Sequence, residues 1–375
     1  MPVSVAVSRP LALVWGEDEF SVKRRARQIF QQWTGETGGW DHDVIDACVA
    51  NSGEALRVIA KLRDSLQALP LFGSSKVAWL QNCNFLGEEP ALATQSVSEV
   101  LAELAREWRS FSWNNVRLLI SAGKVDKRRV FYKTIEALGL VEDYPGWSTE
   151  DPEWQAKAEI WAENELKAAG KGITIEALAE LVAMVGPSPR QLSNEIEKLA
   201  LYIGDRREVQ APDVRAIVTR NKQADAFALG DAFGDRNLPR VLRVLDQELW
   251  ELKLDRQKSP IRLLYGLIAK VRVLIFLKEM AGIGRLKPGM SYSRFKEQLQ
   301  GLPSNLMPED KRLNPLAMHP YVLFKALPQA TKFSLAELVR AMELLLECNQ
   351  RLIYSGLDDA LVLQQTLVQI LNSKN

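Results

Sequence analysis

The sequence predicts an α/β domain built on a parallel sheet, then a small helical domain, then a larger all-helical domain. Over residues 1–145, short apolar runs alternate with helical patterns, which is typical of a parallel sheet covered by helices. Residues 146–220 carry helix caps and breaks. From Ala224 onward strand signals nearly vanish, so the remainder is expected to be helical.

The predicted sheet has strands that are short apolar runs, and the segments between them carry helical patterns. Those helical segments supply the crossovers that parallel strands need. We expect the strands at Leu11–Trp15, Val44–Ile45, Lys76–Leu80, Val116–Ile120 and Val141–Tyr144.

The stretch from residue 67 to residue 80 places two large apolar side chains at a turn. A helix is expected behind Asn51, a good N-cap with Glu54 three residues later. Pro70 ends this helix, because proline has no N–H to donate and restricts the residue before it. Leu71 and Phe72 follow, and they either fold back into the core or face a partner. Single apolar residues at turns are common, so the residues alone favour the core.

The middle of the chain is expected to be a linker followed by a three-helix domain. Residues 146–172 are rich in Ala, Glu and Lys and are interpreted as the linker. Thr174 is expected to cap the first helix, and the Gly and Pro residues at 186–189 end it and start the second. A third short helix follows Pro212, and the domain ends near Thr219.

Helix-start signals recur through the last third of the chain. They are Asn237, Ser259 before Pro260, Ser334 with Glu337, and Asp358 or Asp359. The helix from Ser259 to Gly282 is apolar almost all round over residues 271–277, so it is expected to be buried. Its surroundings are either the core of a bundle within the chain, which we favour, or a contact between subunits.

The overall composition narrows the possible partners and the cellular location. Lys and Arg number 48 and Asp and Glu 47, which leaves no strong field to draw the whole protein onto nucleic acid or an anionic membrane. The three cysteines are widely spaced, share no metal-ligand spacing with either histidine, and suit a reduced cytoplasm. The most apolar stretch, residues 261–277, carries three basic residues, which argues against a membrane span.

A phosphate-binding loop is missing where a nucleotide-binding sheet would carry one. Gly16 follows the first strand, but Glu17, Asp18 and Glu19 come next, and three carboxylates would repel phosphate. The third strand also runs into Gln81 rather than into the acidic pair that holds magnesium. We therefore expect no ATP hydrolysis and no bound nucleotide, cofactor or metal.

The order of motifs resembles the delta subunit of the bacterial DNA polymerase III clamp loader. Each motif is weak alone, but together they span nearly the whole chain in the right order. The matching stretches are Gly16-x-Asp18-x-Phe20, Gln67 to Gly73, Ser121 to Arg128, Asn194 to Tyr202, Asp225-Ala226-Phe227, Ser259-Pro260, and His319-Pro320-Tyr321 with Gln329-Ala330.

The resemblance implies an AAA+-like sheet domain (1–145), a small helical lid (146–220) and a C-terminal helical collar (221–375) that assembles with other subunits. It also implies a subunit without ATPase activity, inside an assembly with DNA-directed DNA polymerase (nucleotidyltransferase) activity, in the cytoplasm. The chain departs from the family pattern at Asn349 and at Ile353-Tyr354, near the end of the penultimate helix. Local collar contacts are therefore in question.

The resemblance assigns the turn a partner, the ring-shaped sliding clamp (beta subunit). Gln67 would hydrogen-bond at the rim of a pocket on the clamp, Leu69 and Leu71 would fill its shallow part, and Phe72 would anchor. The clamp would then be opened for loading onto primed DNA during replication. Two other functions stay open: a divergent AAA+ ATPase, and an architectural subunit of a replication complex without clamp contact.

A basic group after the fourth strand is a candidate for contact with DNA phosphates in the assembly. It consists of Lys124, Lys127, Arg128 and Arg129, at the edge of the sheet where ligands of such folds tend to lie. The alternative is a solvated helix start with Asp126 as its cap.

Overall fold

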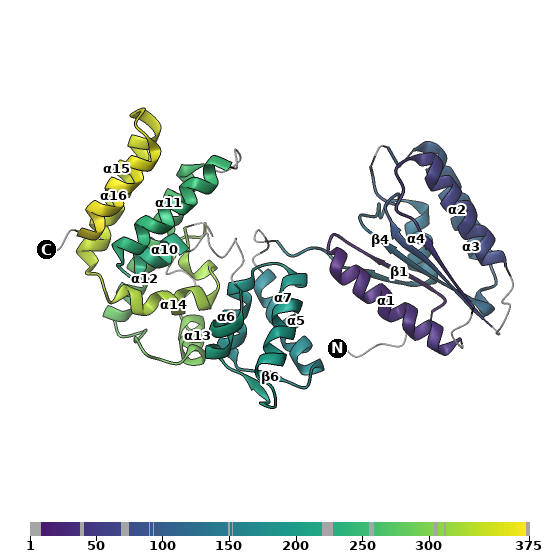
Figure 1. The fold of residues 1–375 in the computed structure, drawn as a ribbon, viewed down its shortest axis with the longest axis horizontal. Helices are drawn as coiled ribbons and strands as arrows, with labels where there is room; N and C mark the ends of the chain where they lie inside the picture. Colours follow the sequence, from purple (N-terminus) through teal and green to yellow (C-terminus); the bar gives the residue numbers. More distant parts are fainter. Residues whose placement is uncertain are drawn as a thin grey trace. The chain divides into compact units, whose positions relative to one another are not determined.

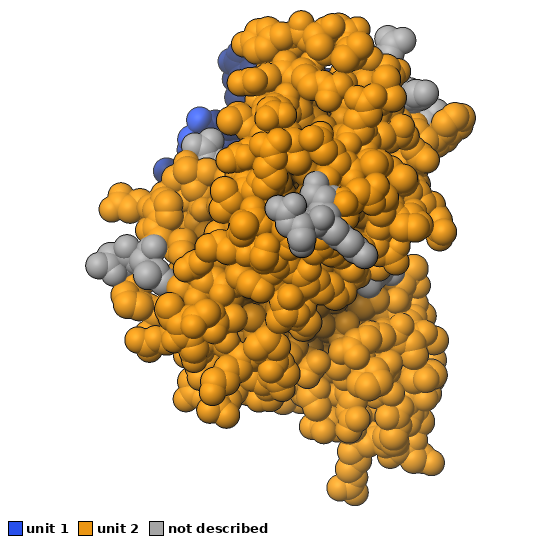
Figure 2. All heavy atoms as spheres, turned by 90° about the vertical axis from the view of Figure 1, so that its left-hand side faces the viewer, with its two compact units in different colours: residues 1–148, 188–190 blue, residues 149–187, 191–375 orange. Residues whose placement is uncertain are grey.

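The structure is a computed structural model, and it contains two compact units. Unit 1 comprises residues 1–148 with 188–190, and unit 2 comprises residues 149–187 with 191–375 (Figures 1 and 2). The expected division into three domains at 145 and 220 stays a prediction. The structure describes residues 9–37, 41–68, 75–89, 91–92, 94–148, 151, 153–219, 228–254, 259–303, 307–310 and 313–372.

Unit 1 is built on a parallel sheet with the strand order β2-β3-β4-β1-β5. All the expected strands are present; the second, third and fourth are longer than expected, and the fifth begins and ends one residue earlier than expected. Trp15 pairs with both Ala122 and Asp143, so the carboxyl ends of three strands meet at one edge. The strands are β1 (Leu11–Trp15), β2 (His42–Asp46), β3 (Lys76–Cys83), β4 (Val116–Ala122) and β5 (Leu140–Asp143).

Helices cover both faces of this sheet (Figure 1). On one face, Ala12 and Val14 of β1 pack against α1 (Glu19–Glu36). On the other, Leu11 and Leu13 share a core with the three remaining helices. Two-sided burial explains why β1 is a continuous apolar run without alternation. The three helices are α2 (Ser52–Gln67), α3 (Gln95–Ser110) and α4 (Val130–Leu138).

Unit 2 begins with helices around a small two-stranded sheet. Thr174 caps α6 as expected, because its Oγ1 accepts the N–H of Ala177 at 3.3 Å. The three helices expected here are α6 (Ile175–Val185), α7 (Pro189–Tyr202) and α8 (Ala211–Ile217), and β6 (Gly172–Ile173) pairs in parallel with β7 (Glu208–Val209).

A fourth helix corrects the interpretation of residues 146–172 as a linker. Helix α5 (Trp154–Ala168) packs against α6 and buries Trp154, Ala158, Ala162 and Leu166. These residues recur every four positions along one face. Two of the four are alanine, so the face is weakly apolar in sequence although it is fully buried in the structure.

The remainder of unit 2 is helical. The expected helix starts are confirmed at Asn237, Ser259, Ser334 and Asp358, whose side-chain oxygens accept backbone N–H groups. The helices are α10 (Ala228–Gly234), α11 (Leu238–Leu254), α12 (Pro260–Gly282), α13 (Tyr292–Gln300), α14 (Pro320–Ala330), α15 (Leu335–Tyr354) and α16 (Asp359–Asn372).

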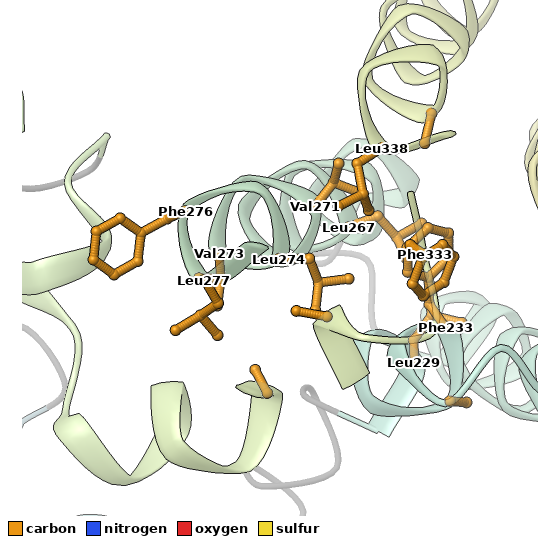
Figure 3. Close-up of a cluster of buried hydrophobic side chains, with 14 of the residues drawn as sticks. Leu229, Phe233, Leu267, Val271, Val273, Leu274, Phe276, Leu277, Phe333 and Leu338 are labelled. Carbon is orange, nitrogen blue, oxygen red and sulfur yellow. The ribbon is translucent and has the colours of Figure 1, made fainter. Parts of the chain in front are cut away.

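Helix α12 forms the centre of this helical core (Figure 3). Val271, Leu274 and Leu277 are completely buried, and α10, α14 and α15 pack around the helix. Beside it, the rings of Phe233 and Phe333 stack with their centroids 5.7 Å apart. Of the two surroundings considered for this apolar helix, a core within the chain is therefore the one observed.

One lysine of α12, Lys270, has a largely buried side chain. The Nζ of Lys270 is 3.1 Å from Oδ1 of Asp231 on α10, and burial lowers the pKa of Lys270 although the aspartate opposes this shift. Gln329 of α14 donates its Nε2 to Asp235 at 2.9 Å. A Cβ at Gly234 would come within 2.5 Å of the Gln329 amide oxygen, so the three helices approach closely here.

The expected fold class, a domain on a parallel sheet followed by helical parts, is confirmed. Among the helices that the structure describes, none combines the length and the apolar character needed to cross a membrane.

The core role of α12 is tested by Leu274→Ala. Removing a completely buried leucine leaves a cavity, so we expect the free energy of unfolding of unit 2 to fall by about 2–5 kcal/mol. Tyr265→Ala is the control, because Tyr265 lies on the same helix with 58% of its surface exposed, and its loss is expected to stay within about 0.5 kcal/mol. Chemical denaturation followed by circular dichroism measures both. Equal losses would show that α12 is not the core helix.

Candidate functional site

The candidate clamp-binding turn follows directly from α2. Asn51 caps this helix as expected, since its Oδ1 accepts the N–H of Glu54 at 3.0 Å. The helix ends at Gln67, and Ala68 is extended with φ −67° and ψ 130°. Gln67 and Ala68 are exposed. Leu69, Pro70, Leu71 and Phe72 lie outside the described residues, so their role stays a prediction.

The two ends of this turn are tied together by a buried lysine that opens β3. Nζ of Lys76 donates a hydrogen bond to the Ser65 carbonyl at 3.1 Å and lies 2.7 Å from Oδ2 of Asp43 on β2. The hydroxyl of Ser65, in the last turn of α2, donates to the same Asp43 oxygen at 2.6 Å. The chain therefore leaves α2 and enters β3 at positions fixed by one polar cluster.

This cluster also fixes the charge state of its carboxylate. Partial burial of Asp43 opposes its ionised form, but the hydrogen bonds from Lys76 and Ser65 outweigh this effect and lower the pKa of Asp43. Lys76 was expected only as the first residue of a strand. A lysine at the start of an apolar run is a weak signal, because its two partners are far from it in sequence.

The loop after β1 is closed against the rest of unit 1. The N–H of Gly16 points at the carbonyls of Ala122 and Gly123, at 3.3 and 3.2 Å, and the N–H of Asp18 donates to the Tyr144 carbonyl at 3.1 Å. A Cβ at Gly16 would lie 2.1 Å from that same carbonyl oxygen. Backbone N–H groups that would cradle a phosphate in a phosphate-binding loop are here engaged by carbonyls.

The basic group after β4 is already paired with carboxylates of unit 1. Each of its four side chains lies within 4.0 Å of an Asp or Glu oxygen. Lys127 also lies over the ring of Trp15, 4.7 Å from its centroid. A DNA phosphate at this edge would have to compete with these carboxylates. The pairs are Lys124 with Glu17 at 2.9 Å, Lys127 with Asp143 at 3.1 Å, Arg128 with Asp126 at 2.9 Å and with Glu88, and Arg129 with Asp126 at 3.5 Å.

Asp126 pairs with two members of this group, Arg128 and Arg129. It is not the N-cap of the following helix, which was the alternative considered from the sequence. Helix α4 begins at Val130 with Arg129 as its N-cap residue, and Asp126 instead accepts the N–H of Arg128 at 3.0 Å. The side-chain hydrogen bond from Arg128 is the main reason that the pKa of Asp126 falls to about 2. At neutral pH the positive charges of this loop are therefore balanced by carboxylates of unit 1.

An exposed apolar surface lies on α15 in unit 2, and sequence reasoning missed most of it. Val339, Leu346 and Ile353 are each about half exposed and follow one another at intervals of seven residues. Seven-residue spacing is the signature of a seam for another helix, and it could have been found in the sequence. Asn349 lies between the last two, and its side-chain oxygen is buried with no hydrogen-bond partner among the described residues.

Comparison with known proteins supports the resemblance drawn from the motifs. Residues 223–370 match the family model for the C-terminal domain of the DNA polymerase III delta subunit. A curated relative, DNA polymerase III subunit delta of Bacillus subtilis (strain 168), is 27% identical over 214 residues, which cover 56% of this chain and 54% of the relative. The chain thus spans about half the length of that relative.

Two solved structures are similar over nearly the whole chain. The Bacillus subtilis DNA clamp loader delta protein has a TM-score of 0.47 and 21% identity, and the match covers 96% of this chain and 95% of that one. A DNA polymerase III gamma subunit-related protein of Thermotoga maritima has a TM-score of 0.28 and 11% identity, with coverage of 98% and 96%.

The tie at the base of the turn is tested by Lys76→Met. The change leaves the Ser65 carbonyl and Asp43 without their cation, so we expect unit 1 to lose about 1–3 kcal/mol of its free energy of unfolding at neutral pH. Because the folded-state pKa of Asp43 is lowered, the pairing stabilises fully above the ordinary value of 3.8 and is lost as pH falls below it. The difference between the variant and the parent should shrink there.

Denaturation curves recorded at several pH values measure this difference. The matched control is Lys23→Met, because Lys23 forms only an exposed ion pair with Glu19 within α1. We expect its loss to stay within about 0.5 kcal/mol. Two outcomes would contradict the proposed role of Lys76. One is an equal loss of unfolding free energy in both variants, and the other is a difference between Lys76→Met and the parent that does not shrink at acidic pH.

Proposed function

We propose that this chain, which carries the C-terminal domain of the DNA polymerase III delta subunit family, acts as the delta subunit of a clamp loader. The observation that carries the proposal is the match of residues 223–370 to that family. In this role the chain binds the sliding clamp and helps open the ring for loading onto primed DNA. It hydrolyses no ATP and works within an assembly that has DNA polymerase activity.

The clamp contact is assigned to the turn at residues 67–72. Leu71 and Phe72 supply on the order of 3–6 kcal/mol of gross burial energy, while association costs roughly as much or more. Additional contact surface is therefore needed, and α2 provides it beside the turn. Asp64 and Gln67 are exposed there, whereas Arg63 is held by Glu107 of α3 at 3.0 Å.

Ring opening by this chain is a population shift rather than a chemical step. A subunit without ATPase activity opens a ring only by binding the open form more tightly than the closed form, by as much free energy as the equilibrium moves. The tie of Lys76 to Ser65 and Asp43 supports this role, because a strained ring needs a firm base on the loader.

The absence of ATP hydrolysis is supported by the closed loop after β1. A nucleotide would need free N–H groups at Gly16 and Asp18, and both are engaged by carbonyls. Glu17 adds a carboxylate at the place of the phosphates, paired with Lys124. This loop favours the loader subunit over a divergent ATPase.

The clamp contact is tested by the double variant Leu71→Ala, Phe72→Ala. We expect the full chain to bind the clamp without nucleotide and the variant to lose at least about 2 kcal/mol of binding free energy, as for an interface hot spot. The control is Val44→Ala, Val130→Ala, which trims two half-exposed apolar side chains elsewhere in unit 1. Surface plasmon resonance with immobilised clamp measures both. Undiminished binding of the first variant would remove the turn as the clamp contact, whereas an absence of clamp binding by the parent chain would leave an architectural subunit as the better proposal.

Assembly with other loader subunits is assigned to the seam on α15. The seam residues Val339, Leu346 and Ile353 face outward, while the opposite face of α15 packs on α12 and α16. The occupant we propose is a helix of another loader subunit.

This seam is tested by the double variant Leu346→Glu, Ile353→Glu. Both positions are exposed, so the chain should fold, but two buried charges at the seam should weaken assembly with the other loader subunits by at least about 2 kcal/mol. Ile160→Glu, Ile175→Glu is the control, since these residues are equally exposed elsewhere in unit 2. Mass photometry of the mixed subunits measures assembly. Unchanged assembly of the seam variant would contradict the assignment.

A further inference from the structure

Two parts of unit 2 that were expected to be separate domains meet in a contact of charged and aromatic side chains. Helices α13 and α14 of the expected collar both pack against α6 of the expected lid (Figure 1). All three helices lie in the same compact unit. The side chains that make the contact are Glu159, Glu180 and Arg215 of the lid and Tyr292, His319 and Tyr321 of the collar, and we call them the lid–collar contact.

Helix α6 takes part in the apolar core of the collar as well as packing within the lid. On the lid side it packs against α5 and α8. Ala179 is completely buried in the same hydrophobic core as α12 and α14, and Ala183, one turn later on the same face, packs against that core. Both residues have short side chains, which let two helices approach closely. The lid therefore supplies part of the interior of the collar.

The first polar interaction of the lid–collar contact involves a tyrosine of the collar. Only 3% of the Glu180 side chain is exposed, and both of its carboxylate oxygens accept from Nε of Arg215 at 3.0 Å. The hydroxyl of Tyr321, at the start of α14, also forms a hydrogen bond with Glu180. Burial, together with the charge of Glu180, raises the pKa of Tyr321, so the hydroxyl keeps its proton and donates it. Separation of the lid from the collar would deprive a buried carboxylate of this donor.

The second polar interaction joins a lid carboxylate to the residue that caps α14. Nδ1 of His319 accepts the N–H of Tyr321 at 3.4 Å, so this nitrogen carries no proton. The proton of the neutral imidazole then lies on Nε2, which donates to Oε1 of Glu159 at 3.0 Å. The partner of one ring nitrogen decides which nitrogen carries the proton. Glu159 of the lid thus sets the tautomer with which His319 caps a collar helix.

Aromatic rings surround these polar groups. The rings of Tyr292 and Tyr321 meet edge to face with their centroids 5.5 Å apart, and the ring of Phe324 lies 5.2 Å from that of Tyr292. The Tyr292 hydroxyl is buried without a hydrogen-bond partner among the described residues, and burial and the charge of Glu159 raise its pKa. Hydrogen bonds in such apolar surroundings are electrostatically stronger than in water.

We propose that the lid–collar contact holds the lid and the collar of the free chain together as one rigid body. Separation would expose the apolar surface around Ala179 and would also break the hydrogen bonds of Glu180 and His319. Both effects oppose the separation. The proposal stands whether or not the chain acts in a clamp loader. Within a loader, a collar displaced by a neighbouring subunit would move the lid with it.

The test is the distance between a spin label on the lid and another on the collar of the full chain. Leu201→Cys on α7 and Tyr265→Cys on α12 supply exposed sites for the labels. Cys48→Ser removes the exposed native thiol, and Cys83 and Cys348 are buried. Double electron–electron resonance measures the distance distribution. We expect one narrow peak, whereas several peaks or one broad distribution would overturn the proposal.

A joint variant tests whether the named side chains are responsible. Glu159→Ala, Tyr321→Phe removes the acceptor of His319 and the donor to Glu180 but keeps the ring contacts. We expect its distance distribution to broaden or to gain a second peak.

The matched control is Glu163→Ala, Tyr354→Phe, which makes the same two changes at surface positions of α5 and α15. The control should keep the narrow peak of the parent. A narrow peak in the joint variant, or equal broadening in both variants, would contradict the proposal.

Two further measurements separate loss of the contact from loss of the fold. Circular dichroism should show the same helical content in the parent and the joint variant. Hydrogen exchange at the Tyr321 amide should become about two- to tenfold faster in Glu159→Ala, because His319 loses the partner that orients it, and an unchanged rate would contradict the role of Glu159. If the joint variant loses helical content, Tyr321→Phe alone takes its place, since it removes a single oxygen, and a narrow peak would again overturn the proposal.

Discussion

The constraint on which unit 2 depends is the need to cover the apolar middle of α12, residues 271–277. A helix with Val271, Leu274 and Leu277 completely buried cannot lie on a surface, so other helices must surround it. The chain meets this need with α10, α14 and α15, which return to α12 from distant parts of the sequence. Lys270 is accommodated only because Asp231 lies beside it, since an unpaired buried charge is costly. The outer helices then offer their remaining faces to partners.

Unit 1 uses the carboxyl edge of its sheet in an unusual way for a parallel α/β fold. Such an edge normally holds a ligand, because loops and helix N-termini converge there. In this protein, backbone carbonyls engage the N–H groups after β1, and Asp126 gathers Arg128 and Arg129. The edge is therefore a stabilising structure, while the apolar turn after α2 carries the proposed binding function.

Elements that depend on local sequence patterns were predicted correctly. Contacts that depend on residues far apart in the sequence were not. Strands and caps were found because buried runs and capping side chains are local signals. Helix α5 was missed because Ala158 and Ala162 form half of its buried face and resemble a solvated segment. The ion pairs of Lys124 with Glu17 and of Arg128 with Glu88 could not be foreseen, since these two partners come from separate loops. The turn itself was assigned through family resemblance rather than through the residues alone.

The tie at Lys76 has a consequence for how this sequence can evolve. Strand register is the most vulnerable property of a sheet, because a shift by one residue turns every side chain to the opposite face. By fastening the first residue of β3 to both α2 and β2, Lys76 separates the register of β3 from the length and composition of the turn before it. Substitutions and insertions that adapt the turn to a changing partner are thereby confined to the loop, and the sheet behind it keeps its pairing.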